Sequence, residues 1–303
     1  MSIAVVFPGQ GSQSVGMGAD LMANEQAKAL FATADKALGY SLSSIMFEGP
    51  EDQLKLTQNT QPALLLHSVA LWQMIADKVK PAYFAGHSLG EYSALVAAGG
   101  IDALDALKAV HNRGKFMQSA VPVGVGGMMA VLGSPNDVVE TVCKEVNSAD
   151  SVVEPANYNS DGQVVVAGHL AALEKFAPLM KDKGAKRVVP LPVSAPFHCS
   201  LMRPARVEME KYLAGVKINT LATPVMNNVD AKLETAEQDV RSALIRQMDG
   251  AVRWSQSVQE LVKLGVDTFI EVGAGAVLAG LVKKIDKNVT CINISSAADI
   301  AKL

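Results

Sequence analysis

Short apolar runs alternate with helix-like segments along most of the chain, and this alternation constrains the fold more than any other feature. Ile3–Phe7, Tyr83–Gly86 and residues 266–272 each have the length and apolar character of a buried strand. Residues 89–98, and a segment from Asp102 to about residue 119, have a helical pattern instead. Strands covered on both faces by crossover helices read as continuous apolar runs. The sequence therefore predicts an α/β fold with a mostly parallel sheet.

A second pattern begins after residues 122–127, a Pro-Val-Gly-Val-Gly-Gly stretch that we interpret as a hinge. The segments after it have the order β-α-β-β-α-β, which is typical of a ferredoxin-like unit. Their expected bounds are 128–132, 134–146, 152–158, 163–167, 169–183 and 187–191. We predict a large domain formed by residues 1–124 and 193–303, with a small ferredoxin-like α+β domain, residues 125–192, inserted into it.

Composition and charge exclude several classes of protein. Hydrophobic residues make up 49% of the 303 residues, which excludes a disordered chain. The densest apolar run, residues 63–72, is far shorter than the ~20 residues of a membrane span, so none is expected. The net charge is −3, so no general basic field exists for nucleic acid. Cys143, Cys199 and Cys291 show no zinc or disulfide spacing, and we expect a reduced, cytoplasmic location and no metal.

The pentapeptide Gly86-His87-Ser88-Leu89-Gly90 lies between a predicted strand and a predicted helix and fits the pattern G-x-S-x-G. In this pattern a serine stands at a sharp strand-to-helix turn, where flanking glycines relieve crowding. The helix N-terminus below the hydroxyl favours a developing anion. The pattern also occurs by chance, but the strand before it and the helix after it favour Ser88 as a nucleophile.

A nucleophilic serine needs a base, and the chain has five histidines. His67 lies in an apolar helix and is expected in the core, while the side chain of His87 is expected to point away from Ser88. His198 follows Ser194-Ala195-Pro196-Phe197, a bent loop where the large domain resumes. This position favours His198 as the base, with a simple loop histidine as the alternative.

The order of these residues differs from that of a conventional α/β-hydrolase, in which a late histidine follows an acid. About a third of the chain follows His198 and contains no further histidine. The group that orients His198 is therefore either an acid or a backbone carbonyl, which fixes the ring tautomer equally well.

The loop Pro8-Gly9-Gln10-Gly11-Ser12 follows the first predicted strand. Its backbone N–H groups are expected at the carboxyl edge of the sheet, where the N–H of Gln10 and that of Leu89 would form a two-donor oxyanion hole. The competing interpretation is a dinucleotide loop, but Ser14 occupies the third glycine position and Asp35 falls inside a helix.

Arg113 follows a mostly apolar helical stretch, residues 103–110. On the inner face of that helix its guanidinium would need an anion, and a guanidinium binds a carboxylate through two parallel hydrogen bonds. A solvated surface arginine is equally compatible with the sequence.

A series of short motifs continues over nearly the whole chain. They are Phe7-Pro8-Gly9-Gln10-Gly11, Thr60-Gln61-Pro62, Gly86-His87-Ser88-Leu89-Gly90-Glu91, Arg113-Gly114, Ala156-Asn157-Tyr158-Asn159, Phe197-His198, Gln247 and Glu271-Val272-Gly273. This series resembles that of the malonyl-CoA:acyl-carrier-protein transacylases, the acyl-loading enzymes of bacterial fatty-acid synthesis. Ala251 and Ala274 depart from the family pattern, which often has proline at these two positions.

The resemblance implies a hydrolase-like large domain with a ferredoxin-like insertion, and it implies roles for individual residues. Ser88 would be the nucleophile, His198 the base, Gln10 and Leu89 the oxyanion donors, and Arg113 the clamp for the malonyl carboxylate. The main-chain carbonyl of Gln247 would orient His198. We also expect Gln61, Met117, Phe197 and Asn157 to line the substrate site.

The resemblance further implies malonyl-CoA and acyl carrier protein as substrate and partner, with no cofactor, and we expect a monomer. Phe197 before His198 resembles the malonyl-preferring pattern of related polyketide acyltransferases. Alternatives are the transacylase of a polyketide synthase or malonate decarboxylase system, a serine esterase, or a nucleotide-binding module. Lys181, Lys183, Lys186 and Arg187 form either a docking patch for an acidic carrier or an ordinary solvated helix end.

Overall fold

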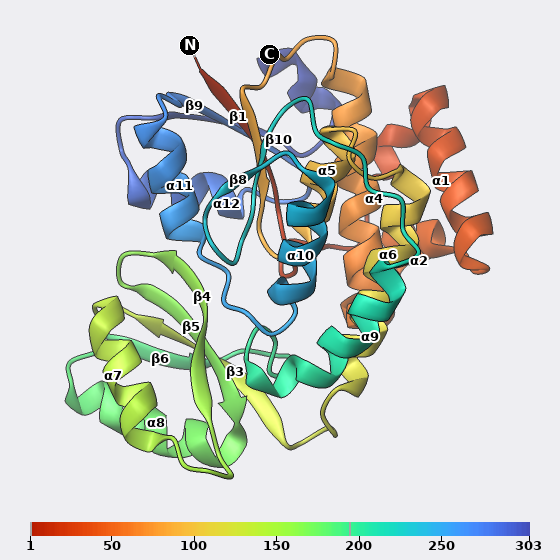
Figure 1. Ribbon diagram of the computed structural model, residues 1–303. Helices are drawn as coiled ribbons and strands as arrows, with labels where there is room; N and C mark the ends of the chain where they lie inside the picture. Colours follow the sequence, from red (N-terminus) through yellow and green to blue (C-terminus); the bar gives the residue numbers. More distant parts are fainter. Residues whose placement is uncertain (1, 194) are drawn as a thin grey trace.

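The computed structural model describes residues 2–193 and 195–303, so Ser194 in the predicted loop before His198 lies outside the described residues. Two sheets and their covering helices make up the described structure (Figure 1). The strands are β1 (Ile3–Phe7), β2 (Tyr83–Gly86), β3 (Gly126–Leu132), β4 (Val153–Ser160), β5 (Gln163–His169), β6 (Arg187–Pro190), β7 (Val225–Met226), β8 (Leu233–Glu234), β9 (Thr268–Val272) and β10 (Thr290–Ile294).

Helices, singly or in groups of up to four, lie between most of these strands along the chain. They are α1 (Glu25–Leu38), α2 (Leu42–Glu48), α3 (Glu51–Lys55), α4 (Thr57–Ile75), α5 (Gly90–Ala97), α6 (Ala103–Ser119), α7 (Asn136–Val146), α8 (Leu170–Asp182), α9 (Arg203–Leu213), α10 (Glu237–Gln247), α11 (Trp254–Lys263) and α12 (Val277–Ile285), with short 3₁₀ turns at Ala19–Ala23, Ser200–Met202 and Ala297–Lys302.

The large sheet has six strands in the order β10-β9-β1-β2-β7-β8. The pairs from β10 through β7 are parallel, and β8 runs antiparallel to β7. The prediction of a mostly parallel sheet is confirmed. The edge strand β10 lies beyond the last strand that the sequence predicts.

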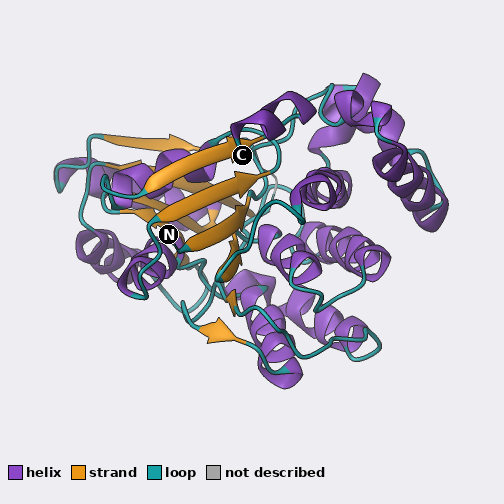
Figure 2. Ribbon diagram, turned by 90° about the horizontal axis from the view of Figure 1, so that it is seen from above, coloured by secondary structure: helices purple, strands orange, loops and turns teal. Residues whose placement is uncertain are grey.

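Helices cover both faces of the large sheet, as the view from above shows (Figure 2). Side chains of β1 alternate between the faces, as the period of a strand requires. Val5 and Phe7 pack into the core under α4, α5 and α6, whereas Ala4 and Val6 pack against α11 and α12. This burial on both faces explains why β1 reads as an unbroken apolar run.

The small sheet has four strands in the order β4-β5-β3-β6, all antiparallel. With α7 and α8 it forms the predicted β-α-β-β-α-β unit, seen in green at the lower left of Figure 1. Val164 and Val166 of β5 face α7 and α8, while Val165 and Ala167 join the core of the large part. The fold class predicted from the sequence is confirmed, and the domain boundaries at 124/125 and 192/193 stay a prediction.

An additional tie joins the small sheet to the large part. Asn157 on β4 forms an isolated parallel bridge with Val252, in the loop before α11. The amide of Tyr158 donates to the carbonyl of Val252 at 2.9 Å, and the amide of Val252 donates to the carbonyl of Ala156 at 2.8 Å. The two sheets are therefore connected by backbone hydrogen bonds as well as by the chain.

Helix α4 continues across a proline. It runs from Thr57 to Ile75 with Pro62 inside it. Proline has no N–H to donate to the carbonyl four residues earlier. His111 on α6 supplies the missing donor, because its Nδ1 lies 2.8 Å from the carbonyl oxygen of Gln58. A contact distant in sequence thus lets the helix continue across Pro62.

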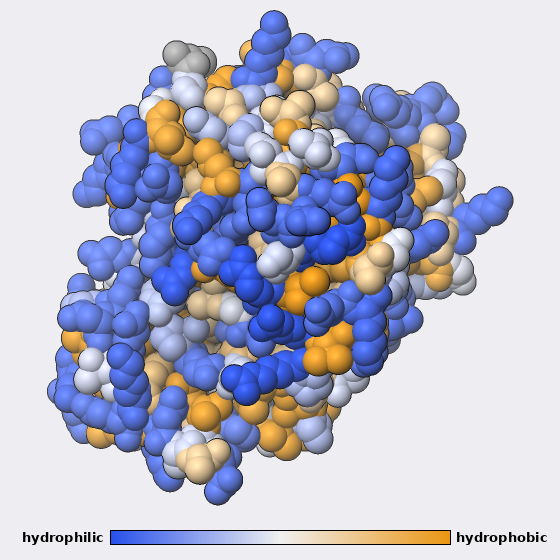
Figure 3. All heavy atoms as spheres, viewed as in Figure 1, coloured by the Kyte–Doolittle hydropathy of each residue, from blue (hydrophilic) through white to orange (hydrophobic). Residues whose placement is uncertain are grey.

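The surface gives no sign of a large apolar face on the side shown in Figure 3, where hydrophilic atoms surround small separate apolar patches. Within the described ranges, no helix is both long and apolar enough to cross a bilayer.

Candidate active site

Ser88 stands on the sharp turn between β2 and α5, with a left-handed φ of 53°. A Cβ on Gly86 would lie 2.0 Å from the carbonyl atoms of Gly90, and a Cβ on Gly90 would lie 2.2 Å from the carbonyl oxygen of Phe7. Both contacts are impossible, so glycine is required on each side of the turn. The tight turn leaves the Ser88 hydroxyl projecting from the carboxyl edge of the sheet.

The side chains of Ser88 and His198 meet although 110 positions separate them. Ser88 Oγ lies 2.7 Å from His198 Nε2, and His198 Nδ1 lies 2.9 Å from the main-chain carbonyl oxygen of Gln247. A carbonyl only accepts, so Nδ1 carries the proton and Nε2 accepts from the Ser88 hydroxyl. Of the two orienting groups considered from the sequence, the structure places the backbone carbonyl at the ring.

His198 is buried and held in its neutral form. Burial and, to a smaller degree, the nearby Arg113 guanidinium lower its pKa to about 3, although the bond to Gln247 acts in the opposite direction. A neutral imidazole with a free lone pair at Nε2 is the form that can take the hydroxyl proton.

Arg113 is buried, with 1% of its surface exposed, so the alternative of a solvated surface arginine is wrong. Nη1 donates to Gln61 Oε1 at 2.8 Å, and Nη2 donates to Gln247 Oε1 at 2.8 Å and to Ser88 Oγ at 3.1 Å. Its guanidinium also lies 5.9 Å from the centre of the Tyr92 ring. A permanent cation is thus fixed beside the projecting hydroxyl.

Gln247 contributes its side chain as well as its carbonyl. Its amide nitrogen donates to the Ser88 carbonyl at 3.0 Å and to Glu91 Oε2 at 2.9 Å, while its amide oxygen accepts from Arg113. The reverse amide orientation would set N–H against N–H and oxygen against oxygen, so the partners fix the side chain. One residue therefore positions Ser88, His198 and Arg113.

Sequence reasoning missed Asn228 and Glu91. Asn228 Oδ1 accepts the amide of Ser88 at 2.6 Å, and its Nδ2 donates to the Gly86 carbonyl at 2.7 Å. Glu91 Oε2 accepts the amide of Asn228 at 2.9 Å. Asn228 follows β7, which lies next to β2, and a polar residue at such a strand end could have indicated a site residue. However, β7 has only two residues, so the sequence shows no strand pattern there.

Gln10 follows β1, and its loop lies against the serine turn. A Cβ on Gly9 would be 2.6 Å from the His87 carbonyl oxygen, and Gln10 lines the same cavity as Ser88. Among the described residues, no protein acceptor takes the amide N–H of Gln10 or of Leu89. Gln10 follows β1 and Leu89 follows the neighbouring β2, so both amides lie at the carboxyl edge of the sheet.

Two neighbouring cavities lie at the serine turn: the inner cavity is lined by Ser88 itself, and the outer cavity by the adjacent His87. The inner one has a volume of about 110 Å³ and the outer one about 480 Å³. The inner cavity is lined by the predicted site residues Gln10, Gln61, Ser88, Arg113, Met117, Asn157, Phe197 and His198. Gln10, His87 and Asn157 line both cavities, so the two cavities adjoin.

The other residues considered from the sequence make different contacts. His67 is buried in α4, as expected, and neither ring nitrogen has a partner among the described residues. His87 Nε2 lies 2.9 Å from Asn159 Oδ1. Lys183 at the end of α8 pairs with Glu145 at 3.4 Å. In the described part of the chain, no group of three or more His, Cys, Asp or Glu side chains is arranged to hold a metal.

Comparison with known proteins places the chain among acyl transferases. The family model described as "Acyl transferase domain" matches residues 4–301. The chain belongs to this family. Two of its curated relatives are named malonyl CoA-acyl carrier protein transacylase. The one from Escherichia coli K12 is 48% identical over 302 residues (98% of this chain, 97% of the relative), and the one from Bacillus subtilis 168 is 44% identical over 300 residues (98% and 95%).

Solved structures of this family agree closely with the fold. An acyl carrier protein S-malonyltransferase from Vibrio cholerae has a TM-score of 0.97 at 46% identity, covering 100% of this chain and 99% of that one. A malonyl-transacylase in complex with its type II PKS acyl-carrier protein has a TM-score of 0.96 at 44% identity, covering 100% and 98%. These matches confirm the resemblance to the malonyl-CoA:acyl-carrier-protein transacylases and the assignment as an acyltransferase.

Proposed function

We propose that this acyltransferase moves a malonyl group from malonyl-CoA to the phosphopantetheine thiol of acyl carrier protein, through a malonyl ester on Ser88, in fatty-acid biosynthesis. The observation that carries the proposal is the position of Ser88 Oγ, which lies within hydrogen-bond distance of both His198 Nε2 and the Arg113 guanidinium. A base and a carboxylate-binding cation therefore converge on one nucleophile.

In the first half-reaction, His198 Nε2 takes the Ser88 proton while Oγ attacks the thioester carbonyl of malonyl-CoA. The resulting oxyanion rests on the N–H groups of Gln10 and Leu89, each lowering the barrier by roughly 3 kcal/mol. The C–S bond then breaks, and the CoA sulfur leaves with the proton from His198.

In the second half-reaction, the phosphopantetheine thiol of the carrier gives its proton to His198 and attacks the Ser88 ester. The C–O bond breaks, and Ser88 recovers its proton. The outer cavity of about 480 Å³ offers room for the pantetheine arm that both substrates share. This chemistry uses no metal or redox cofactor.

The inner cavity and Arg113 favour a short acyl group that ends in a carboxylate. The inner cavity is the smaller of the two, with a volume of about 110 Å³, which suits a short acyl group better than a long one. Malonyl binding gives Arg113 a directly bonded anion, which none of its hydrogen-bond partners in the protein supplies, whereas an acetyl group does not. The buried Phe197 narrows the same cavity, which favours malonyl over the larger methylmalonyl group.

Other assignments are less well supported. A serine esterase needs no buried arginine beside the nucleophile. A transacylase of a polyketide synthase or malonate decarboxylase would use the same chemistry with another carrier, and one solved relative is described with a type II PKS carrier protein. We propose a monomer in the cytoplasm, which suits the three free cysteines.

Intact-protein mass spectrometry after brief exposure to malonyl-CoA tests the proposal. We expect the wild-type chain to gain the mass of one malonyl group and to lose it again when phosphopantetheinylated carrier protein is added. The Ser88→Ala variant should gain nothing. A wild-type chain that stays unmodified, or a Ser88→Ala variant that gains the same mass, would contradict the proposed function.

A further inference from the structure

Arg113 is a buried cation whose direct hydrogen-bond partners are all neutral. Its guanidinium donates to the amide oxygens of Gln61 and Gln247 and to the hydroxyl oxygen of Ser88. Among the described residues, no carboxylate bonds to it directly. A buried charge is costly unless an opposite charge compensates it, so the free enzyme needs a counter-charge close by.

The side-chain amide of Gln247 connects Arg113 to Glu91. Its oxygen accepts from Arg113 Nη2 at 2.8 Å, and its nitrogen donates to Glu91 Oε2 at 2.9 Å. The cation at the oxygen end and the carboxylate at the nitrogen end polarise this amide in the same direction. Glu91 thus acts on Arg113 through a single amide group.

Glu91 lies in the first turn of α5 with 3% of its surface exposed. Burial raises the pKa of its carboxyl group to about 7, although the hydrogen bonds from Gln247 and Asn228 act in the opposite direction. A carboxylate with this pKa changes its protonation near neutral pH when a neighbouring charge changes.

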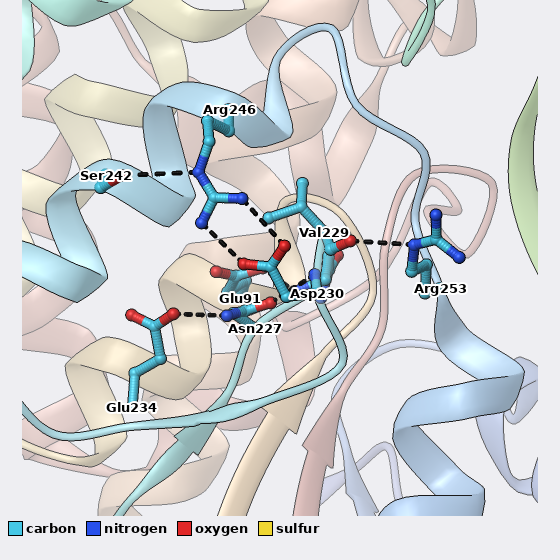
Figure 4. Close-up of polar contacts among 9 residues, drawn as sticks. Glu91, Asn227, Val229, Asp230, Glu234, Ser242, Arg246 and Arg253 are labelled. Atoms are coloured by element: carbon cyan, nitrogen blue, oxygen red, sulfur yellow. Dashed lines mark hydrogen bonds and ion pairs between the residues drawn. The ribbon is translucent and has the colours of Figure 1, made fainter.

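Other charged and titratable groups also surround Glu91. Glu234 on β8 raises its pKa and Arg113 on α6 lowers it, while Glu91 itself acts on Tyr92 in α5 and on Arg246 in α10. Figure 4 shows Glu234 held by Asn227 and Arg246 forked onto Asp230. Arg113 lines the inner cavity. Glu234 and Arg246, which also lie near Glu91, do not line it.

We propose that Glu91 is the counter-charge of Arg113 in the free enzyme, acting through the Gln247 amide, and that it takes up a proton from solvent when a carboxylate-bearing acyl group binds Arg113. The inference rests on the proposed function, because the malonyl group supplies that carboxylate. Two carboxylates near one guanidinium repel each other, so the arrival of the second favours protonation of the first. The site then keeps one anion for one cation. Glu91 is a positioning residue here and does not touch the reacting atoms.

Calorimetric titration of Ser88→Ala protein, in which no acyl transfer occurs, measures this proton. Malonyl-CoA and acetyl-CoA are each titrated at pH 7.5 in two buffers of different ionisation enthalpy. We expect malonyl-CoA to take up about half a proton more than acetyl-CoA. The excess should vanish in the Ser88→Ala/Glu91→Gln protein, because glutamine keeps the acceptor oxygen but not the charge. Equal uptake with and without Glu91 would overturn the inference.

A second measurement needs no change at Glu91 and decides the question if the double variant does not fold. In Ser88→Ala protein, the ratio of the Kd for malonyl-CoA to the Kd for acetyl-CoA should rise about tenfold from pH 6.5 to 8.5, since proton uptake weakens binding as the pH rises. A constant ratio overturns the inference. If the wild-type enzyme forms no malonyl-Ser88 ester, the proposed function falls and this inference with it. An ester without excess proton uptake removes this inference alone.

Discussion

The side-chain oxygen of Asn228 accepts the amide N–H of Ser88 at 2.6 Å, across 140 positions of the sequence. The other end of the same side chain donates to the carbonyl of Gly86 at 2.7 Å. Asn228 therefore holds the backbone on both sides of His87 and stabilises the left-handed φ of Ser88. The nucleophile turn is held from a neighbouring strand as well as by its own glycines.

Replacing Asn228 with alanine should damage both the fold and the chemistry. Two buried backbone groups lose their partner, so we expect the free energy of unfolding to fall by about 2–3 kcal/mol and kcat to fall about tenfold. Denaturant unfolding and malonyl transfer rates measure the two effects. Asn227→Ala is the matched control, because Asn227 is equally buried but bonds to Glu234 and Asp230. Equal losses of kcat in the two variants would argue against a role for Asn228 in positioning Ser88.

Gly90→Ala should abolish activity, because the new Cβ would lie 2.2 Å from the carbonyl oxygen of Phe7. Either β1 or the serine turn has to move, and both carry groups of the proposed site. Gly280→Ala, in α12, is the matched control because no atom lies within 4 Å of its added Cβ. There we expect a gain in stability of about 0.5–1 kcal/mol and unchanged activity. Full activity in Gly90→Ala would show that the turn tolerates a side chain.

Arg113→Ala should lower kcat/KM for malonyl-CoA much more than for acetyl-CoA. Loss of the buried partner of the malonyl carboxylate costs about 4 kcal/mol, or about a thousandfold in kcat/KM. Initial rates of serine acylation with the two CoA esters measure the difference. Arg206→Ala serves as a control, because Arg206 forms an ion pair with Asp249 at 3.2 Å. This variant should leave both rates unchanged. Equal losses for both esters would mean that Arg113 supports the chemistry and not the choice of acyl group.

His67 should make the protein sensitive to acid. Burial lowers its pKa to about 4, against a smaller opposing effect of Asp20. Because this value lies below the 6.5 of an unfolded histidine, the unfolded chain binds the proton more readily, and acidification between about pH 6.5 and 4 favours unfolding. We expect His67→Met to remove about 2 kcal/mol of the stability loss between pH 7 and pH 4.5, measured by urea unfolding. An identical pH dependence in the variant would exclude this role.

Charge reversal at the end of α8 tests whether that surface docks the carrier protein. If Lys181 and Lys186 contact an acidic carrier, their change to glutamate should raise the KM for the carrier several-fold and leave the kinetics with malonyl-CoA unchanged. Lys263→Glu, on α11 and paired with Glu260 at 3.3 Å, is a control on another surface. An unchanged carrier KM would leave these lysines as a solvated helix end.

The sequence predicted those parts of the fold and site that depend on local pattern. β1, β2, the turn at Ser88 and the helix start at Asp102 are encoded by neighbouring residues, and the Asp102 side chain accepts the amide of Leu104 at 2.8 Å. His198 could be predicted as the base because the chain has only five histidines.

The contributions of Asn228, Glu91 and the Gln247 side chain depend on contacts between distant segments. Asn228 follows a strand of two residues, Glu91 reads as an ordinary helical glutamate, and α4 continues past Pro62 because of His111. No local pattern reveals such pairings, because each needs a partner that only the tertiary structure brings near.

The backbone bridge between Asn157 and Val252 has a consequence for how acyl groups are selected. It fastens the small sheet to the large part at a point beside the inner cavity, which Asn157 itself lines. Because backbone hydrogen bonds join the two parts at this point, we expect them to resist moving apart when a larger acyl group approaches. The inner cavity should therefore keep its dimensions, so that an acyl group larger than the cavity fails to bind rather than binding in a distorted position.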